Sequence, residues 1–177
     1  SGLLGKKIYI ELKKNKNLKL YHSGLKKRKF DFLNKTKLKK LIYQTNANVI
    51  INTIGLTNIE KCETNSKTSK KINFEIVKEI FRIKSNKKLR FNLIHISTDQ
   101  FYNQKNKKKS KEKSKIFLLN NYCKHKRMAE KICLKNKALI FRTNFFGKSI
   151  SKNKIFKDWI FRSFKMKEKI YLFDDVY

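Results

Sequence analysis

Continuous apolar runs alternate along the chain with stretches whose apolar residues recur at helical spacing. Runs without a polar face are typical of strands that are buried on both sides of a parallel sheet. Such runs occupy residues 48–52, 93–97 and 138–142, with a weaker one at residues 18–21. This alternation predicts right-handed βαβ units, and therefore an α/β fold in which one doubly wound parallel sheet lies between two helical layers.

The segments between these runs have the apolar stripes of amphipathic helices. Five apolar residues from Ile72 to Phe81 follow one another at spacings of four, one, three and one, which places them on one helix face. Residues 38–42 and 128–133 carry shorter stripes of the same kind. A further helix is predicted near the start of the chain, over residues 6–13.

Composition adds a strongly basic charge without identifying a partner. The 177 residues are 40% hydrophobic, enough to bury the core of one domain, but the formal charge is +33. Lysine is spread along the chain and proline is absent, a bias that A/T-rich codons explain. The segment 104–115 has eight charged residues and no aromatic residue to stack a base, so we expect a solvated loop and no specific nucleic-acid partner. A basic surface would still attract an anionic substrate or a cofactor phosphate.

Cysteine spacing and hydropathy indicate the compartment. Cys62, Cys123 and Cys133 are odd in number and lack the close pairs of a zinc site, so we expect neither a disulfide framework nor a metal. No apolar run approaches the roughly 20 residues that span a bilayer. We therefore expect a soluble, cytoplasmic protein with no membrane partner. Because the chain begins at Ser1 and stops at Tyr177 inside an apparently ordered segment, we also expect both ends to continue.

A tyrosine and a lysine four residues apart are the strongest candidates for catalysis. Tyr122 and Lys126 are expected on one helix face, where a nearby cation lowers the pKa of a phenol towards the range of acid–base chemistry. In a chain so rich in Lys and Tyr, such a pair also arises by chance. Ser97, Thr98 and Asp99 strengthen it, because they end the most apolar run and open parallel sheets bind ligands beyond the carboxyl ends of their strands.

Two glycine-containing segments are candidates for contact with a dinucleotide. Gly2 and Gly5 precede the first predicted helix, whose N-terminus offers free N–H groups and positive potential to a phosphate. Residues 52–55 leave another strand end, and their small side chains would let a dinucleotide pass closely. A helix-capping turn and an ordinary strand-to-loop turn explain the two segments equally well.

Several segments, in the same order along the chain, resemble the dTDP-4-dehydrorhamnose reductase family of extended short-chain dehydrogenases. Residues 48–62, NVIINTIGLTNIEKC, resemble its strand and loop VINxxAxTxVDxxE, and residues 93–102, LIHISTDQFY, are similar to its hhSTDYVFdG element. Tyr122 stands 24 positions after Thr98, as the family pattern requires. The other matches are Lys71–Asn73, residues 139–147 (LIFRTNFFG) and Phe173–Asp175.

This resemblance implies a Rossmann-like NAD(P)-binding domain over residues 1–177, with most of a C-terminal substrate-binding region lying beyond them. It implies reduction of a 4-keto nucleotide-sugar by NADPH or NADH. Thr98, Tyr122 and Lys126 match the family's catalytic positions: Tyr122 as proton donor, Thr98 as hydrogen-bond partner of the carbonyl, and Lys126 as a ligand of the nicotinamide ribose that lowers the tyrosine pKa. A homodimer is the candidate assembly.

The resemblance also implies ligand-binding positions on either side of the catalytic residues. The cofactor positions, besides Tyr122 and Lys126, are Gly2, Leu3, Leu4, Gly5, Thr53, Ile54, Gly55 and Ser97. The substrate positions are Thr98, Asp99, Gln100, Asn144 and Phe145. Gln100 replaces the family's tyrosine beside the substrate, which leaves the sugar open.

Other functions fit the same residues. Relatives with the same tyrosine and lysine carry out epimerisation or dehydration, some bind the dinucleotide as regulatory subunits without turnover, and a basic nucleic-acid-binding domain is a further alternative. The histidines receive structural interpretations: His95 is expected to be packed within a strand, and His125 to project away from the face that carries Tyr122 and Lys126. His22 has no partner that the sequence identifies.

Overall fold

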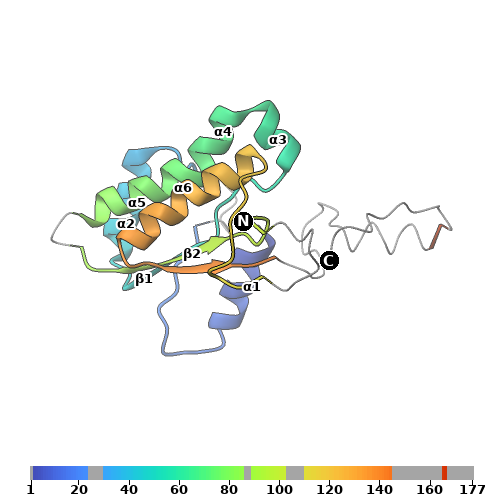
Figure 1. The fold of residues 1–177 in the computed structure, drawn as a ribbon. Coiled ribbons are helices and arrows are strands. Elements are labelled where there is room, and N and C mark those ends of the chain that lie inside the picture. Colours follow the sequence, from blue (N-terminus) through green and yellow to red (C-terminus); the bar gives the residue numbers. More distant parts are fainter. Residues whose placement is uncertain (1, 24–29, 86–88, 103–109, 145–164, 167–177) are drawn as a thin grey trace.

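The protein is described by a computed structural model, which covers residues 2–23, 30–85, 89–102, 110–144 and 165–166. Its sheet has three strands in the order β1-β2-β3, with β1 at Val49–Asn52, β2 at Asn92–Ser97 and β3 at Leu139–Arg142 (Figure 1). The helical elements are α1 (Leu3–Leu12), α2 (Lys35–Thr45), α3 (Ile59–Thr64), α4 (Ser66–Lys70), the π-helical turn η1 (Lys71–Glu75), α5 (Ile76–Lys84) and α6 (Asn121–Lys135).

Both strand pairs are parallel, so the carboxyl ends of all three strands lie at one edge of the sheet. In the β1–β2 pair Asn52 stands opposite His95, and in the β2–β3 pair Ser97 stands opposite Arg142. Helices connect successive strands, as parallel pairing requires. The three stronger apolar runs are thus confirmed as strands, each within one residue of its predicted bounds, and the Rossmann-like α/β fold is confirmed.

Asparagine begins four of the described helices. In each case its side-chain oxygen accepts the backbone N–H three residues later, which satisfies one of the amides that a helix start leaves free. The capping residues are Asn34 for α2, Asn58 for α3, Asn65 for α4 and Asn120 for α6. Each such cap typically contributes about 1 kcal/mol to the stability of its helix.

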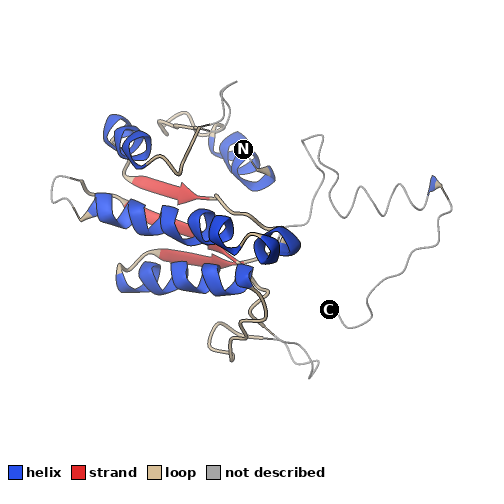
Figure 2. Cartoon of the chain, turned by 90° about the horizontal axis from the view of Figure 1, so that it is seen from above, coloured by secondary structure: helices blue, strands red, loops and turns tan. Residues whose placement is uncertain are grey.

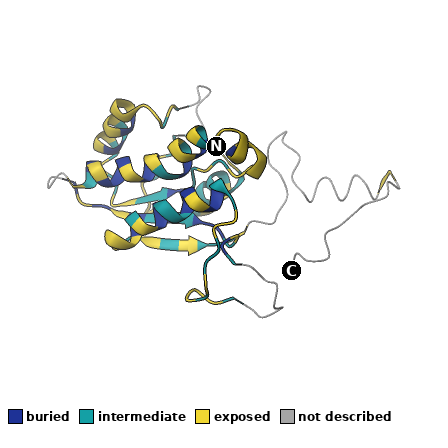
Figure 3. Cartoon of the chain, turned by 45° about the horizontal axis from the view of Figure 1, so that its top comes forward, coloured by how far each residue is buried: buried dark blue, intermediate teal, exposed yellow. Residues whose placement is uncertain are grey.

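The main core lies between the sheet and the helices α2, α5 and α6, which cover one of its faces (Figures 1 and 2). The stripe predicted for residues 72–81 supplies much of it, since Ile76, Val77, Ile80 and Phe81 are buried. Leu93 from β2 and the buried side of α6 complete it. Figure 3 shows the buried sides of α5 and α6 turned towards the strands. The helix α1 lies on the other side of the sheet, so two helical layers enclose the strands (Figure 1).

Three local predictions need correction or restriction. Residues 18–21 form no strand: their backbone pairs with none of the described strands, and Leu18 and Tyr21 stay exposed. The first helix starts at Leu3 and not at Lys6, because Gly2 in an extended conformation already serves as its N-cap. Of the predicted solvated loop, residues 110–115 are described and form an exposed turn, and the rest lies outside the described residues. None of the described helices has the length and apolar character needed to cross a membrane.

Candidate active site

The carboxyl edge of the sheet brings together most of the residues singled out in the sequence. The chain leaves β1 through Thr53–Gly55 and leaves β2 through Thr98–Gln100, while Tyr122 stands in the first turn of α6. The N-terminus of α1 lies against the first of these loops. Parallel strand direction causes this convergence, and the connecting helices determine which side chains enter it.

Tyr122 and Thr98 meet directly at this edge. Both side chains are buried, and Thr98 lies close enough to Tyr122 to act on the pKa of its phenol. Burial raises the pKa of Tyr122 above its ordinary value, and the neighbouring Thr98 offsets only part of that rise. The expectation that Lys126 lowers this pKa is therefore wrong for the structure as it stands, because the loss of hydration outweighs every favourable contact of the phenolate.

Lys126 lies one helical turn after Tyr122 and is turned towards β2. Only 3% of it is exposed. Its ammonium donates a hydrogen bond to the backbone carbonyl of Ile96, 2.5 Å away, and its Nζ lies 3.5 Å from His95 Nε2. Burial lowers the pKa of Lys126 to about 8, against the opposing influence of Cys133 and Glu130. A lysine with so low a pKa is close to giving up its proton at physiological pH.

His95 continues the contact of Lys126 across the sheet. Its ring is fully buried, and its Nδ1 lies 3.2 Å from the side-chain nitrogen of Asn52. Burial and the neighbouring Lys126 lower the pKa of His95 to about 3, so the ring is uncharged at neutral pH. The sequence interpretation of a packed strand histidine is correct as to burial. It missed the contact with Lys126, which depends on the register between β1 and β2.

The loop after β1, which carries three predicted cofactor positions, is held from both of its ends. The side-chain oxygen of Asn52 accepts the N–H of Ile54, and Asn73 on η1 both accepts from the N–H of Leu56 and donates to its carbonyl. Gly55 lies so close to Asn73 that an added Cβ would stand 3.4 Å from the Asn73 side-chain oxygen. Asn73 belongs to a motif noted in the sequence, but its function as a clamp on this loop appears only in the structure.

The predicted phosphate-binding residues at the start of the chain contact the same loop. Gly2 caps α1, and Leu3, Leu4 and Gly5 form its first turn. A Cβ on Gly5 would stand 2.7 Å from Thr53 Oγ1, closer than real side chains come. Glycine at this position therefore lets the helix N-terminus, with its free N–H groups and positive potential, lie directly beside the end of β1.

The predicted substrate positions lie beyond β2 and β3. The backbone N–H of Gln100 donates to the Thr98 hydroxyl at 3.2 Å, and the Gln100 side chain is exposed. Asp99 is half-buried and near enough to Tyr122 to favour its neutral form. Asn144 is exposed just after β3, and Phe145 lies outside the described residues. The structure thus gathers Thr98, Asp99 and Gln100 beside Tyr122.

A buried ion cluster behind the site was not predicted from the sequence. The carboxylate of Glu130 is fully buried and accepts hydrogen bonds from Arg142 at 2.8 Å and from Arg127 at 2.7 Å. Burial would raise the pKa of Glu130, but the hydrogen bonds from Arg142 and Arg127 bring it below its ordinary value. Arg142 also donates to the hydroxyl of Tyr102 at 2.7 Å. The cluster therefore joins α6, the end of β3 and the loop after β2.

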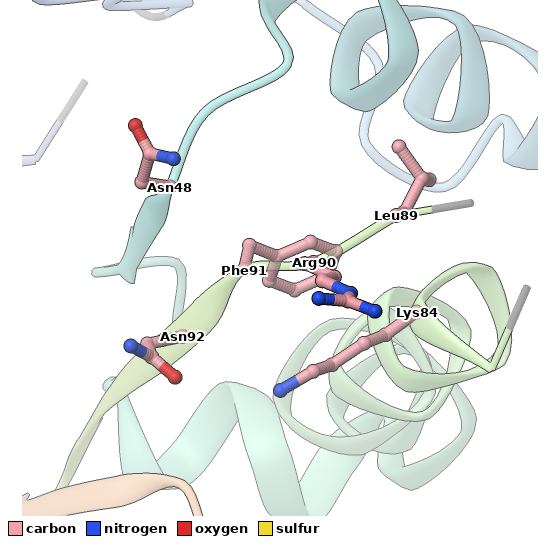
Figure 4. Close-up of a pocket in the computed structure, with 6 residues that line it drawn as sticks. All are labelled: Asn48, Lys84, Leu89, Arg90, Phe91 and Asn92. Carbon is pink, nitrogen blue, oxygen red and sulfur yellow. The ribbon is translucent and has the colours of Figure 1, made fainter. Parts of the chain in front are cut away.

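A hollow at the opposite edge of the sheet contains none of the predicted site residues. It has a volume of about 400 Å³ and lies at the amino ends of β1 and β2 (Figure 4). Its lining residues are Asn48, Lys84, Leu89, Arg90, Phe91 and Asn92. Nothing among them offers an acid–base pair, so the chemistry of the described residues is concentrated at the carboxyl edge.

Known proteins share the family and the fold of this chain. The family model of the RmlD substrate binding domain matches residues 1–177. No curated protein matches the chain. A hypothetical dTDP-4-dehydrorhamnose reductase from Sulfolobus tokodaii is similar at 28% identity, with a TM-score of 0.67, over 80% of this chain and 52% of that one.

Two further solved structures share the fold at lower identity. A dTDP-4-dehydrorhamnose reductase from Clostridium acetobutylicum aligns with a TM-score of 0.79 and 24% identity, over 94% of this chain and 57% of that one. A dTDP-4-dehydrorhamnose reductase from Bacillus anthracis, solved in complex with NADP, aligns with a TM-score of 0.75 and 20% identity, over 93% and 57% of the two chains. The chain thus spans a little more than half the length of these structures.

Proposed function

Because the chain belongs to the RmlD substrate binding domain family, we propose that it carries the dinucleotide-binding and proton-donating part of a reductase. The reaction is the reduction of a 4-keto group on a nucleotide-linked sugar, with NADPH or NADH as the reductant. The names of the similar solved structures support this reaction class. The chain contributes Thr98, Tyr122 and Lys126 to it.

The placement of the buried Tyr122 phenol beside Thr98 at the carboxyl edge carries the proposal. A carbonyl oxygen that becomes an alcohol must gain a proton, and a phenol that keeps its proton at neutral pH is able to supply it. The raised pKa of Tyr122 suits a donor better than a base. The Thr98 hydroxyl is placed to hold the same oxygen, so the two hydroxyl groups together orient the substrate carbonyl.

The residues at this edge also fit a dinucleotide. The reduced nicotinamide would supply the hydride, and the first turn of α1, the loop Thr53–Gly55, Ser97 and Lys126 would hold the cofactor. Gly5 supports this fit, because the helix N-terminus reaches the sheet edge only without a side chain there. In its ammonium form Lys126 would still have two protons for the ribose hydroxyl groups after its bond to the Ile96 carbonyl.

Replacing Tyr122 tests the proposal on a protein that contains this chain. Tyr122→Phe removes the proton donor and keeps the ring, so we expect kcat for the keto-sugar nucleotide to fall about 10²–10⁴-fold, the usual contribution of a general acid. Dinucleotide affinity, measured by calorimetric titration, should change little. Tyr21→Phe, at an exposed tyrosine far along the chain, is the matched control and should keep full turnover.

Other outcomes would replace the reductase by one of its alternatives. Normal turnover in Tyr122→Phe would remove Tyr122 from the chemistry. Product formation without stoichiometric oxidation of the added reduced cofactor would identify an epimerase or a dehydratase. Tight dinucleotide binding with no reaction of any keto-sugar nucleotide would identify a regulatory subunit, and salt-sensitive binding of random DNA without dinucleotide affinity would identify a nucleic-acid-binding domain.

A further inference from the structure

The buried contact between His95 and Lys126 raises a question of proton placement. Nζ of Lys126 and Nε2 of His95 lie 3.5 Å apart, and both groups are shielded from water. An ammonium group only donates hydrogen bonds, whereas each nitrogen of a neutral imidazole either donates or accepts. The position of the single imidazole proton therefore decides whether His95 can accept a hydrogen bond from Lys126.

The surroundings of Asn52 determine this position. The N–H of Ile54 donates to Asn52 Oδ1 at 3.1 Å, which identifies the other atom of the amide as the NH₂ group. That NH₂ group faces His95 Nδ1 at 3.2 Å, so Nδ1 must accept. A neutral ring that accepts at Nδ1 carries its proton on Nε2, and this N–H points towards Lys126.

We propose that Asn52 and His95 are positioning residues for Lys126: Asn52 fixes His95 as the Nε2–H tautomer, and this N–H directs the Lys126 protons to the Ile96 carbonyl and favours the uncharged amine. An amine nitrogen accepts the His95 hydrogen bond, which an ammonium cannot do. The low pKa of Lys126, which burial causes, is in keeping with this arrangement.

Other charged and titratable groups around Lys126 act against this arrangement. Glu130 and Cys133, on the following turns of α6, both favour the ammonium form. On the strand side His95 is the titratable neighbour, and Asn52 stands directly across from it in the register of β1 and β2. Asn52, His95 and Lys126 thus form a hydrogen-bonded relay that runs from β1 through β2 to α6. A ligand that contacts Lys126 would change the proton affinity that this relay sets. The inference gains its catalytic meaning from the proposed function.

The histidine tautomer is measurable without any substrate. The chain has three histidines, so long-range ¹H–¹⁵N correlation spectra of the full chain resolve each ring. We expect His95 to show the neutral Nε2–H pattern throughout pH 6–8. An Nδ1–H pattern or an imidazolium in this range would overturn the proposal, whatever the variants below do.

Two substitutions of Asn52 change the tautomer by different means. Asn52→Asp keeps the acceptor for Ile54 and accepts a proton from Nδ1, while Asn52→Leu removes the donor without adding charge. Both should move His95 to the Nδ1–H tautomer, leaving Nε2 free to accept from the ammonium. We expect the titration midpoint of Lys126, followed through ¹³C-labelled lysine, to rise by about one pH unit, a tenfold change in proton affinity. An unchanged midpoint in folded Asn52→Leu would contradict the relay.

A matched control uses the second buried histidine. His125 Nδ1 is hydrogen-bonded to the Ser69 hydroxyl at 2.9 Å, so Ser69→Ala should alter the His125 pattern and leave both His95 and Lys126 unchanged. A shift of Lys126 in this variant would show that general loosening of the core, not the tautomer, sets its pKa. The two proposals can be disproved independently. The spectra test the positioning of Lys126 without any turnover, and Tyr122→Phe tests the reductase without changing Asn52.

Discussion

The two edges of the sheet differ in how they treat polar side chains. At the carboxyl edge Thr98, Tyr122 and Lys126 are all buried, and each has a partner. At the amino edge Lys84 and Arg90 line an open hollow (Figure 4), where Arg90 is exposed and half-buried Lys84 lies with its Nζ 5.4 Å from the centre of the Phe91 ring. Both edges belong to the same parallel sheet. The two edges therefore show polar groups in two environments: cations beside an open hollow at one edge, and buried groups with partners at the other.

The difference shows that net charge is a poor guide to function here. The formal charge is +33, but most lysines in the described part of the chain are exposed and contribute little individually to stability. A buried polar group says more about function than an exposed one. Burying a charge without a partner costs several kcal/mol, so buried charges are found together with partners. Substituting a buried group near the carboxyl edge and an exposed group elsewhere allows their contributions to the free energy of unfolding to be compared.

Removing Glu130 should give the largest effect on stability. Glu130→Ala leaves Arg142 and Arg127 without their buried carboxylate, and we expect the free energy of unfolding to fall by about 3–5 kcal/mol. The measurement is urea unfolding at pH 7. Because the pKa of Glu130 lies below its ordinary value, the carboxylate stabilises the fold above the unfolded-state pKa, and this stabilisation is lost as the pH falls through the folded pKa. The difference between variant and parent should shrink accordingly in acid.

Two exposed groups serve as references for this measurement. Glu11 forms a surface ion pair with Lys14, and both side chains are 69% exposed. Glu11→Ala and Arg90→Ala should each change the stability by less than about 0.5 kcal/mol. A cost for Arg90→Ala comparable with that of Glu130→Ala would abolish the contrast between the two edges.

Substituting Lys126 should give the next largest change in the free energy of unfolding. This change should shrink at high pH, whereas that of Glu130→Ala shrinks in acid. Its folded pKa of about 8 lies below the ordinary value of 10.5, so the unfolded chain binds the proton more tightly and stability rises as the pH increases from 8 to 10.5. The shift corresponds to about 3 kcal/mol that burial of the ammonium costs below pH 8. Lys126→Met, which keeps the aliphatic stem, should therefore be more stable than the parent at pH 7.

This advantage should shrink as the pH rises from 8 to 10.5, and it should be lost above that range, where the parent lysine is neutral in both states. Chemical unfolding at several pH values between 7 and 10.5 gives the comparison, with Lys84→Met at the amino edge as the control. A stability difference that does not vary with pH would show that packing, not charge, accounts for the effect of Lys126→Met.

The contact between α1 and the loop after β1 should give the smallest effect. Gly5→Ala places a methyl group 2.7 Å from the Thr53 hydroxyl oxygen, and we expect a loss of about 1–3 kcal/mol in the free energy of unfolding. Gly2→Ala is the matched control, since nothing lies within 4 Å of its added Cβ. Thr53→Ala should restore most of the loss in the double variant. Equal effects at Gly2 and Gly5 would mean that helix propensity, not the close contact, decides.

The sequence predicted the elements well where local pattern determines them. The apolar runs gave β1, β2 and β3, and the spacing from Ile72 to Phe81 gave the buried side of α5. The prediction of a strand at residues 18–21 was wrong, because so short an apolar run does not specify a strand without a neighbouring strand to pair with.

The candidate site was predictable only in part. The order of Thr98, Tyr122 and Lys126 was readable from the chain, and the structure brings Thr98 to Tyr122. The partners of Lys126 and of Glu130 were not readable. His95 and Arg142 reach them through strand register and helix packing, which join residues far apart in the chain. The direction of the Tyr122 pKa was also wrong, because burial cannot be read from a spacing of four.

The π-helical turn η1 sits between two segments that make different contacts. Before it, Ser69 contacts His125, and after it Ile76 and Val77 enter the core. A turn of this type holds one residue more than the α-helical pattern, so the deletion of a single residue would rotate one segment against the other by about 100°. A one-residue gap in a sequence alignment of this region therefore indicates that the helix after η1 has turned about its axis. The apolar stripe of α5 would then face a different direction relative to Asn73, which holds the loop after β1.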